Sequence, residues 1–190
     1  LFYYANWSRA FGGGPWILAP TWTLALEEQF YLIWPLLFWC CLRLKAPTLW
    51  IVLGLALASA IWRGVLFMQG HDIDELLFRF DTKCDALFLG VALALVGPLQ
   101  MKQLARLFWF AATYLAICMV LPIKTLSWSY LGGTTLVAIS AVIVLAKIVS
   151  YPNSRTVAVL EWAPLKNLGK ISYAFYLWHS LVLYPLLAHS

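Results

Sequence analysis

Charge is scarce in this sequence. Only 11% of the 190 residues are Asp, Glu, Lys or Arg, whereas an average soluble domain carries about 25%. This shortage excludes a soluble domain, because too few charged side chains are present to cover its surface. Intrinsic disorder is excluded as well, since 63% of the residues are hydrophobic and 16% are aromatic, and such a chain can bury far more apolar surface than a disordered one. We therefore expect an integral membrane protein that contacts the lipid bilayer.

Clusters of basic or metal-binding side chains are also lacking. The formal net charge is +5, but the 13 Lys and Arg residues are scattered and never form a run of three. A nucleic-acid partner is therefore not expected, because nucleic-acid surfaces carry clustered cations. The four cysteines have no metal-ligand spacing and are expected to be buried structural side chains. We expect no bound metal.

Long uncharged segments recur along the chain and predict an all-α fold, a polytopic transmembrane helix bundle with about six spanning helices. A spanning helix needs about 20 largely apolar residues. Residues 1–21 are expected to form an outer loop, and Val157–Leu168, which contains Pro164, a short segment at the membrane surface. The expected spanning helices cover residues 22–42, 48–68, 83–96, 104–121, 126–149 and 171–188.

Cations distinguish the two sides of this expected bundle. Cytoplasmic loops of membrane proteins carry an excess of Lys and Arg. One side has fewer cations, namely Arg79, Lys83 and Lys124, and holds most of the acidic loop residues. The other side is therefore predicted to be cytoplasmic; its cations are Arg43, Lys45, Lys102, Arg106, Arg155, Lys166 and Lys170.

Three ionisable residues fall inside the first two expected helices, where a charge is costly and marks a functional candidate. Glu27 and Glu28 lie in the first helix and Arg63 lies in the second. Lys45, in the turn between these antiparallel helices, is 18 residues from both Glu27 and Arg63, so the acids and the cation are expected at similar depth. Two interpretations remain open: a structural Glu27–Arg63 ion pair, or a polar wall that binds substrate.

Polar residues also mark the third and last expected helices. Ser172, Tyr176 and His179 have the spacing i, i+4 and i+7, which places them on one helix face. His179 is either a core histidine or a general base that acts on a substrate. Asp85 begins an apolar run and is expected to stabilise the start of its helix electrostatically. The acidic segment His71–Asp85 is otherwise expected to be a solvated loop.

Three segments carry longer motifs: WTLALEEQFYLIWP at Trp22–Pro35, TKCDALFLG at Thr82–Gly90 and LGKISYAFYLWH at Leu168–His179. In this order they resemble the signatures W-S-L-x-x-E-x-Q-F-Y-L-x-x-P, T-R-x-D-x-L-x-x-G and L-G-x-I-S-Y-x-x-Y-L-x-H of membrane acyltransferase family 3. That family includes the O-acetyltransferases of bacterial surface and exported carbohydrates. The departures are mild: Thr23 replaces Ser, and Lys83 replaces Arg.

This resemblance implies a multi-pass enzyme of the bacterial inner membrane. Such an enzyme transfers an acyl group, expected to be acetyl, from acyl-CoA as donor substrate to a carbohydrate hydroxyl of a surface or exported glycan. A bound cofactor is not expected. The substrate-binding residues are expected to be Glu27, Glu28, Arg63, Asp85 and Tyr176.

His179 is expected to support catalysis, because the family's principal catalytic histidine lies on a helix upstream of the first motif. The chain is therefore expected to be the carboxy-terminal portion of such an acyltransferase, with its N-terminal catalytic helices and last helix outside it. Two other hypotheses remain open. One is a transporter of a small polar or sugar substrate that uses Glu27 and Arg63 as a gate. The other is an inactive remnant.

Overall fold

The computed structural model describes residues 4–12, 21–99, 103–121 and 129–188, and all regular elements in these ranges are helical. The longer helices are α2 (Thr21–Arg43), α3 (Thr48–Met68), α5 (Cys84–Val96), α6 (Leu104–Val120), α7 (Thr134–Ser150) and α9 (Ala163–Ala188). Three single-turn helices, α1 (Ala5–Ala10), α4 (Ile73–Phe78) and α8 (Arg155–Leu160), lie between or beside them. A kinked turn, η4 (Ser129–Gly133), in which Gly132 has non-helical dihedral angles, precedes α7. The expected all-α fold is confirmed.

The helix ends follow local sequence signals. After α3 the chain reverses at Gly70, whose φ of 83° suits a residue without a Cβ. The N–H of His71 donates to Leu66 O (3.2 Å) and that of Gly70 donates to Phe67 O (3.1 Å), which is the hydrogen-bond pattern of a Schellman motif. The same pattern ends α2, but there Lys45 holds the positive φ of 50°.

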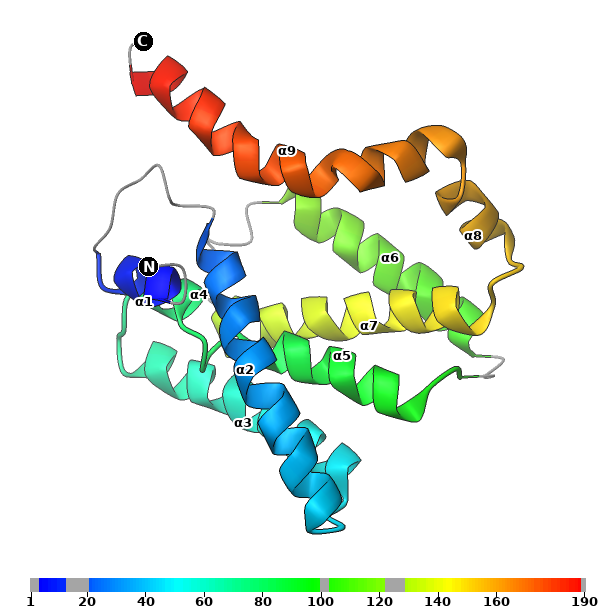
Figure 1. Ribbon diagram of the computed structural model, residues 1–190, viewed down its shortest axis with the longest axis horizontal. Coiled ribbons are helices and arrows are strands. Elements are labelled where there is room, and N and C mark those ends of the chain that lie inside the picture. Colours follow the sequence, from blue (N-terminus) through cyan, green and yellow to red (C-terminus); the bar gives the residue numbers. More distant parts are fainter. Residues whose placement is uncertain (1–3, 13–20, 100–102, 122–128, 189–190) are drawn as a thin grey trace.

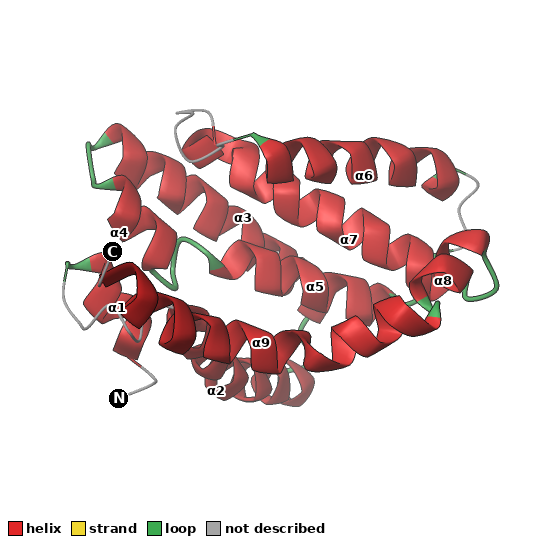
Figure 2. Cartoon of the chain, turned by 90° about the horizontal axis from the view of Figure 1, so that it is seen from above, coloured by secondary structure: helices red, strands yellow, loops and turns green. Residues whose placement is uncertain are grey.

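Four helices form the bundle on which the other elements are placed (Figure 1). α3 packs on α5, α5 packs on α7, and α7 packs on α6. Seen from above, these four helices lie beside one another, whereas α9 lies at the edge of this group, in front of α2 (Figure 2). One core cluster joins α2, α3 and α5, where Phe30 meets the edge of Phe88 at 5.5 Å between ring centroids. A second cluster places Tyr130 against Leu66 and Leu76.

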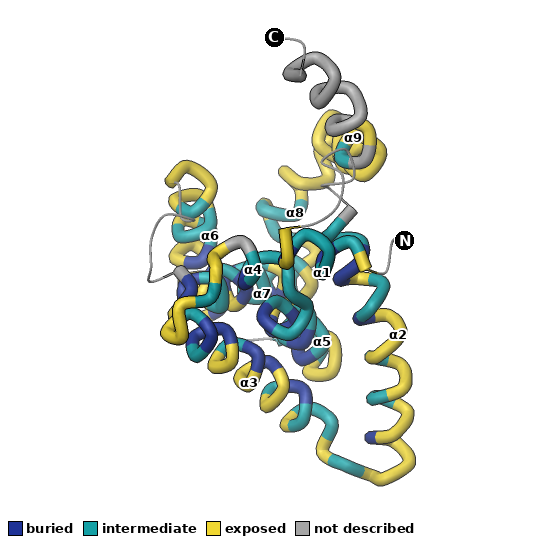
Figure 3. The backbone as a smooth tube through the Cα atoms, turned by 90° about the vertical axis from the view of Figure 1, so that its left-hand side faces the viewer, coloured by how far each residue is buried: buried dark blue, intermediate teal, exposed yellow. Residues whose placement is uncertain are grey.

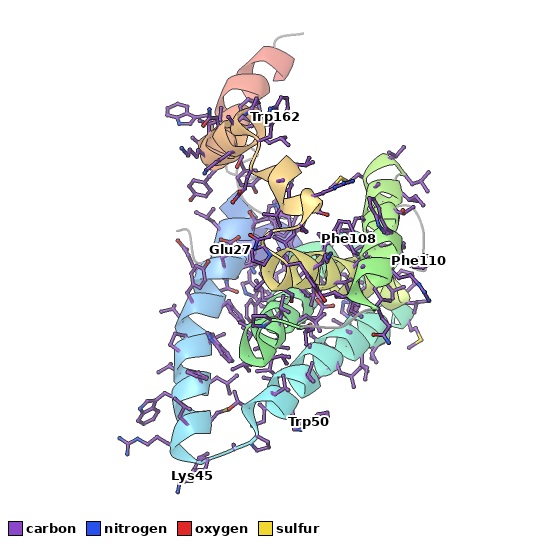
Figure 4. All side chains as sticks on the ribbon, turned by 90° about the vertical axis from the view of Figure 1, so that its right-hand side faces the viewer. Glu27, Lys45, Trp50, Phe108, Phe110 and Trp162 are labelled. Carbon is purple, nitrogen blue, oxygen red and sulfur yellow. The ribbon has the colours of Figure 1, made fainter. Side chains whose placement is uncertain are left out.

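The second half of α2 and the first half of α9 are largely exposed, as Figure 3 shows. Exposed large side chains on α2 include Tyr31, Leu36 and Trp39, and those on α9 include Phe175 and Trp178. α2 and α3 leave the turn at Lys45 in diverging directions (Figures 3 and 4), so their far ends lie well apart.

Two helical segments are long and apolar enough to cross a membrane, by length and composition. They are Thr48–Met68 and Tyr130–Ser150, each of 21 residues and mean hydropathy 2.0. Only 28% and 17% of their most apolar windows is buried within the protein, whereas the core helix of a soluble protein is mostly buried. This exposure suggests a membrane protein. Cys84–Val96 and Leu104–Val120 are apolar but shorter, and the expected total of about six spans stays a prediction.

Several helix bounds differ from those of the expected spans. Helix α9 begins at Ala163 instead of residue 171, because Pro164 lies in its first turn, where a missing N–H breaks no hydrogen bond. The expected outer loop contains helix α1, and the acidic segment contains α4. α7 begins at Thr134 after η4, whereas residue 126, its expected start, lies outside the described residues.

Candidate functional site

Arg63 is the most deeply buried charged side chain among the described residues, with 1% of its surface exposed. Its Nη1 donates to Thr82 O at 2.5 Å. Its Nη2 forms an ion pair with Asp85 Oδ2 at 3.0 Å and also donates to Thr135 Oγ1. A cation at this depth is stable only when it is paired and hydrogen-bonded, and Arg63 meets both conditions.

Thr135 completes the network. Its hydroxyl donates to Asp85 Oδ2 at 2.8 Å, so Arg63, Asp85 and Thr135 form a closed triangle between α3, α5 and α7. Asp85 lies in the first turn of α5, as expected, where a carboxylate also interacts favourably with the helix dipole. No sequence pattern singles out Thr135, which is one hydroxyl residue among many.

The structural Glu27–Arg63 ion pair, one of the two interpretations left open by the sequence, is therefore wrong, because Asp85 is the acidic partner of Arg63. The prediction of a similar depth rests on the 18 positions that separate each of the two residues from Lys45. It fails because α2 and α3 diverge from that turn, whereas α3 packs closely on α5. Glu27 is exposed and lies in the half of α2 that is farther from Lys45 (Figure 4).

A second polar region surrounds the first half of α2. Gln29 Nε2 donates to Asn6 Oδ1 at 2.9 Å, and Asn6 is fully buried. Glu28 Oε2 is buried and has no hydrogen-bond partner among the described residues. Three polar residues of α2 thus lie within or beside one turn: exposed Glu27, half-buried Glu28 and Gln29.

Helix α9 reaches this region through one hydroxyl pair. Tyr176 Oη lies 2.7 Å from Thr23 Oγ1. Ser172, on the same face as Tyr176, donates to Gly169 O within its own helix. His179 lies in α9, but its side chain is outside the described part of the chain. The structure therefore brings Tyr176 close to the turn of α2 that carries Glu27. Arg63 and Asp85 belong to the separate network with Thr135.

The acidic segment after α3 is more ordered than a solvated loop. Arg79 donates to Glu75 Oε1 (2.6 Å) and to both carboxylate oxygens of Asp81 (3.0 and 2.6 Å). His71 Nδ1 lies 3.0 Å from Glu75 Oε2, and Trp62 Nε1 donates to Asp81 Oδ2 at 2.9 Å. Acidic and basic residues alternate along this segment, which indicates that ion pairs can form. The pattern does not predict which residues pair.

These contacts set the ionisation of the cluster. The hydrogen bond with His71, together with the one from Arg79, holds the pKa of Glu75 below its ordinary value despite partial burial. Burial alone raises the pKa of Asp81, but the hydrogen bonds from Arg79 and Trp62 outweigh it, and that pKa is also lowered. The two carboxylates raise the pKa of Arg79. Across the described residues, no three His, Cys, Asp or Glu side chains are grouped to hold a metal ion.

Comparison with known proteins agrees with the resemblance carried by the three sequence motifs. Residues 1–188 match the family model described as "Acyltransferase domain". The chain is 35% identical to "Peptidoglycan O-acetyltransferase OatA" of Listeria monocytogenes, over 98% of this chain and 32% of that protein. It is 32% identical to "Putative peptidoglycan O-acetyltransferase YrhL" of Bacillus subtilis, over 100% of this chain and 33% of that protein.

"O-acetyltransferase OatA" of Staphylococcus aureus is 30% identical, over 98% of this chain and 33% of that protein. The chain thus spans about a third of the length of these curated relatives. No solved structure matches it. Because the family model covers nearly all of the sequence, the chain belongs to acyltransferase family 3.

Proposed function

We propose that the protein carrying this chain is an integral membrane O-acyltransferase. It transfers an acetyl group from acetyl-CoA to a carbohydrate hydroxyl of a surface or exported glycan, and peptidoglycan is the acceptor that the names of the relatives favour. The protein crosses the bacterial inner membrane several times, with about six spanning helices in this chain. The observation that carries this proposal is the family match over residues 1–188.

The geometry supports the proposal because two of the three family motifs meet in space. Thr23 belongs to the first motif and Tyr176 belongs to the third, and their hydroxyl oxygens lie 2.7 Å apart. Glu27 is one helical turn from Thr23 and is exposed. A carboxylate and a phenol near each other supply an acceptor and a donor of hydrogen bonds, which suits a ligand rich in hydroxyl groups.

Acyl transfer needs a base that takes the proton of the attacking hydroxyl, and donors that stabilise the negative oxygen that forms on the acyl carbon. We assign substrate contacts to Glu27, Glu28 and Tyr176. His179 supports the reaction from α9, with the principal base outside this chain. Arg63 and Asp85 act indirectly, because their charges are buried and paired, by fixing α3 and α5 beside the site.

The direct test uses the protein expressed from its complete gene and reconstituted in liposomes. Acetyl-CoA labelled in the acetyl group is supplied on one side and purified peptidoglycan on the other, and base-labile acetyl ester on the glycan is measured. We expect transfer by the wild type and a loss of at least about tenfold for His179→Ala, less than the roughly 10²–10⁴-fold contribution of a principal acid–base group, because His179 is assigned a supporting role. His71→Ala is the matched control, because His71 pairs with Glu75 away from α9.

Two results would contradict the proposal. Wild-type liposomes that consume no acetyl-CoA and form no ester would remove the enzyme assignment. Substrate-dependent proton flux without acetyl-CoA consumption would instead support the transporter hypothesis. A His179→Ala protein with wild-type transfer would remove only the role of that histidine.

A further inference from the structure

The basic side chains of the described chain differ in whether a neighbouring group compensates their charge. Arg63 and Arg79 pair with carboxylates, and Arg9, Arg43 and Lys147 lie over aromatic rings. Five exposed cations have neither kind of partner within the described residues, namely Lys45, Arg106, Arg155, Lys166 and Lys170. Their charges are therefore available to a ligand.

Four of these five cations belong to one end of the molecule. Leu99 N donates to Ser150 Oγ at 2.7 Å, which joins the connection after α5 to the end of α7. Helix α8 follows α7 and lies between the first turns of α6 and α9 (Figures 1 and 2). From residue 151 to the end of the chain, Glu161 is the only acidic residue. This basic end consists of Arg106, Arg155, Lys166 and Lys170.

Two surface hollows adjoin the basic end. A groove of about 450 Å³ runs along the face of α8 from Arg155 to Trp162, and the indole of Trp162 is 63% exposed. A second hollow of about 340 Å³ is lined by residues 150–154. There Ser154 Oγ is buried and has no hydrogen-bond partner among the described residues. Cations, an exposed aromatic ring and an unsatisfied hydroxyl thus adjoin one surface, and both hollows have the size of small-molecule sites.

These groups suit a ligand that combines several negative charges with an aromatic ring. Arg and Lys bind phosphate oxygens, and nucleic-acid bases stack on exposed aromatic side chains. Coenzyme A carries a pyrophosphate, a 3′-phosphate and an adenine ring. The headgroup of a common anionic phospholipid carries less charge and no base, so it would leave most of the cations and the indole unused. The basic end also belongs to the side that its excess of cations predicts to be cytoplasmic.

We propose that the basic end binds the donor acetyl-CoA: Arg155, Lys166 and Lys170 contact its phosphate groups, and Trp162 stacks on its adenine. The hydroxyl of Ser154 donates to a phosphate oxygen, and Arg106 adds to the positive potential. This inference rests on the proposed function. It adds to that function a donor site, made by α8 and the first turns of α9, that is separate from the residues assigned to the acceptor.

The test measures binding and turnover in the protein from its complete gene, reconstituted in phosphatidylcholine liposomes. The probes are coenzyme A, dephospho-coenzyme A and acetyl-CoA. For Arg155→Gln/Lys166→Gln/Lys170→Gln, the Kd of coenzyme A and the KM for acetyl-CoA are expected to rise about tenfold, the combined effect of three exposed ion pairs. The kcat is expected to be unchanged, because these contacts are the same in the ground state and the transition state. Trp162→Leu is expected to raise the Kd at least about fivefold through lost stacking.

Comparison of the two coenzymes identifies the phosphate contact. The wild type is expected to bind coenzyme A more tightly than dephospho-coenzyme A, and the triple variant is expected to lose most of this preference, because the two changes remove the same interaction. Lys45→Gln and Trp50→Leu are the matched controls and should keep the wild-type Kd. Both side chains are exposed, and both lie at the end of the molecule opposite Trp162 (Figure 4).

The outcomes separate the two proposals. A triple variant with the wild-type Kd and KM overturns the inference, while transfer by the wild type upholds the function. An effect of the triple variant that appears only when phosphatidylglycerol is added to the liposomes also overturns the inference, because the cations would then bind lipid headgroups. A wild type that binds coenzyme A through these cations but transfers no acetyl group removes the proposed function and upholds the site. A wild type with neither binding nor transfer removes both.

Discussion

Removal of the Asp85 carboxylate tests the buried triangle most directly. Asp85→Ala leaves the guanidinium of Arg63 charged, at a site where 1% of its surface is exposed. Breaking a buried ion pair by removing one partner costs about 3–5 kcal/mol. Arg63 keeps its bonds to Thr82 O and to Thr135, so we expect a loss near the lower end of this range.

Two further variants provide reference values for the stability lost in Asp85→Ala. Thr135→Val leaves the ion pair intact and removes the hydroxyl that bonds both partners, so it should cost about 1–3 kcal/mol. Arg63→Met/Asp85→Ala removes both charges. Because replacing a buried pair by apolar groups is often neutral, this double variant should be more stable than Asp85→Ala alone.

The assay is equilibrium unfolding in mixed detergent micelles, followed by tryptophan fluorescence. Glu161→Ala is the control, since Glu161 is exposed after α8 and surface substitutions change stability by about 0.5 kcal/mol or less. A stabilising role of the Asp85 carboxylate is refuted if Asp85→Ala lowers the free energy of unfolding by no more than this control does, or if adding Arg63→Met to Asp85→Ala lowers it further.

Two other perturbations have defined outcomes. Glu75 and Asp81 have folded pKa values below their ordinary 4.5 and 3.8, so the stability they contribute is present above those values and is lost as the pH falls through the lower folded values. Arg79→Met should therefore flatten the decline of Tm below about pH 4.5, and an unchanged decline would contradict this origin. Lys45 has φ of 50° at the Schellman position after α2; Lys45→Gly should raise the free energy of unfolding by up to about 1 kcal/mol and Lys45→Val should lower it. Denaturant titration measures the free energy of unfolding of both variants. Equal values for Lys45→Gly, Lys45→Val and the wild type would contradict backbone strain at this position.

Much of the helical layout is predictable from the sequence because charged residues, glycine and proline bound the apolar runs. α3 has the expected bounds, and α5 and α6 end within one residue of theirs. α9 is one of the exceptions, because Pro164 can either interrupt a helix or occupy its first turn, and the sequence alone does not distinguish the two.

The candidate site is less predictable, since it depends on which helices pack together. Burial of Arg63 follows from its apolar surroundings in the sequence, but its partner depends on the packing of α3 against α5 and α7. Thr23 could be identified as part of a motif, although nothing in the sequence pairs it with Tyr176. Sequence patterns report periodicity along one helix, whereas these contacts join segments 22 to 153 residues apart.

The order of synthesis gives the Arg63 triangle a consequence for folding. Arg63 leaves the ribosome first, its carboxylate partner follows 22 residues later, and Thr135 follows 72 residues later. Since domains generally fold from the N-terminus during synthesis, α3 exists for an interval with a charge that none of these groups satisfies. Arg63 can therefore reach its fully paired state only after α5 and α7 are synthesised, which links the burial of one arginine to the order of assembly.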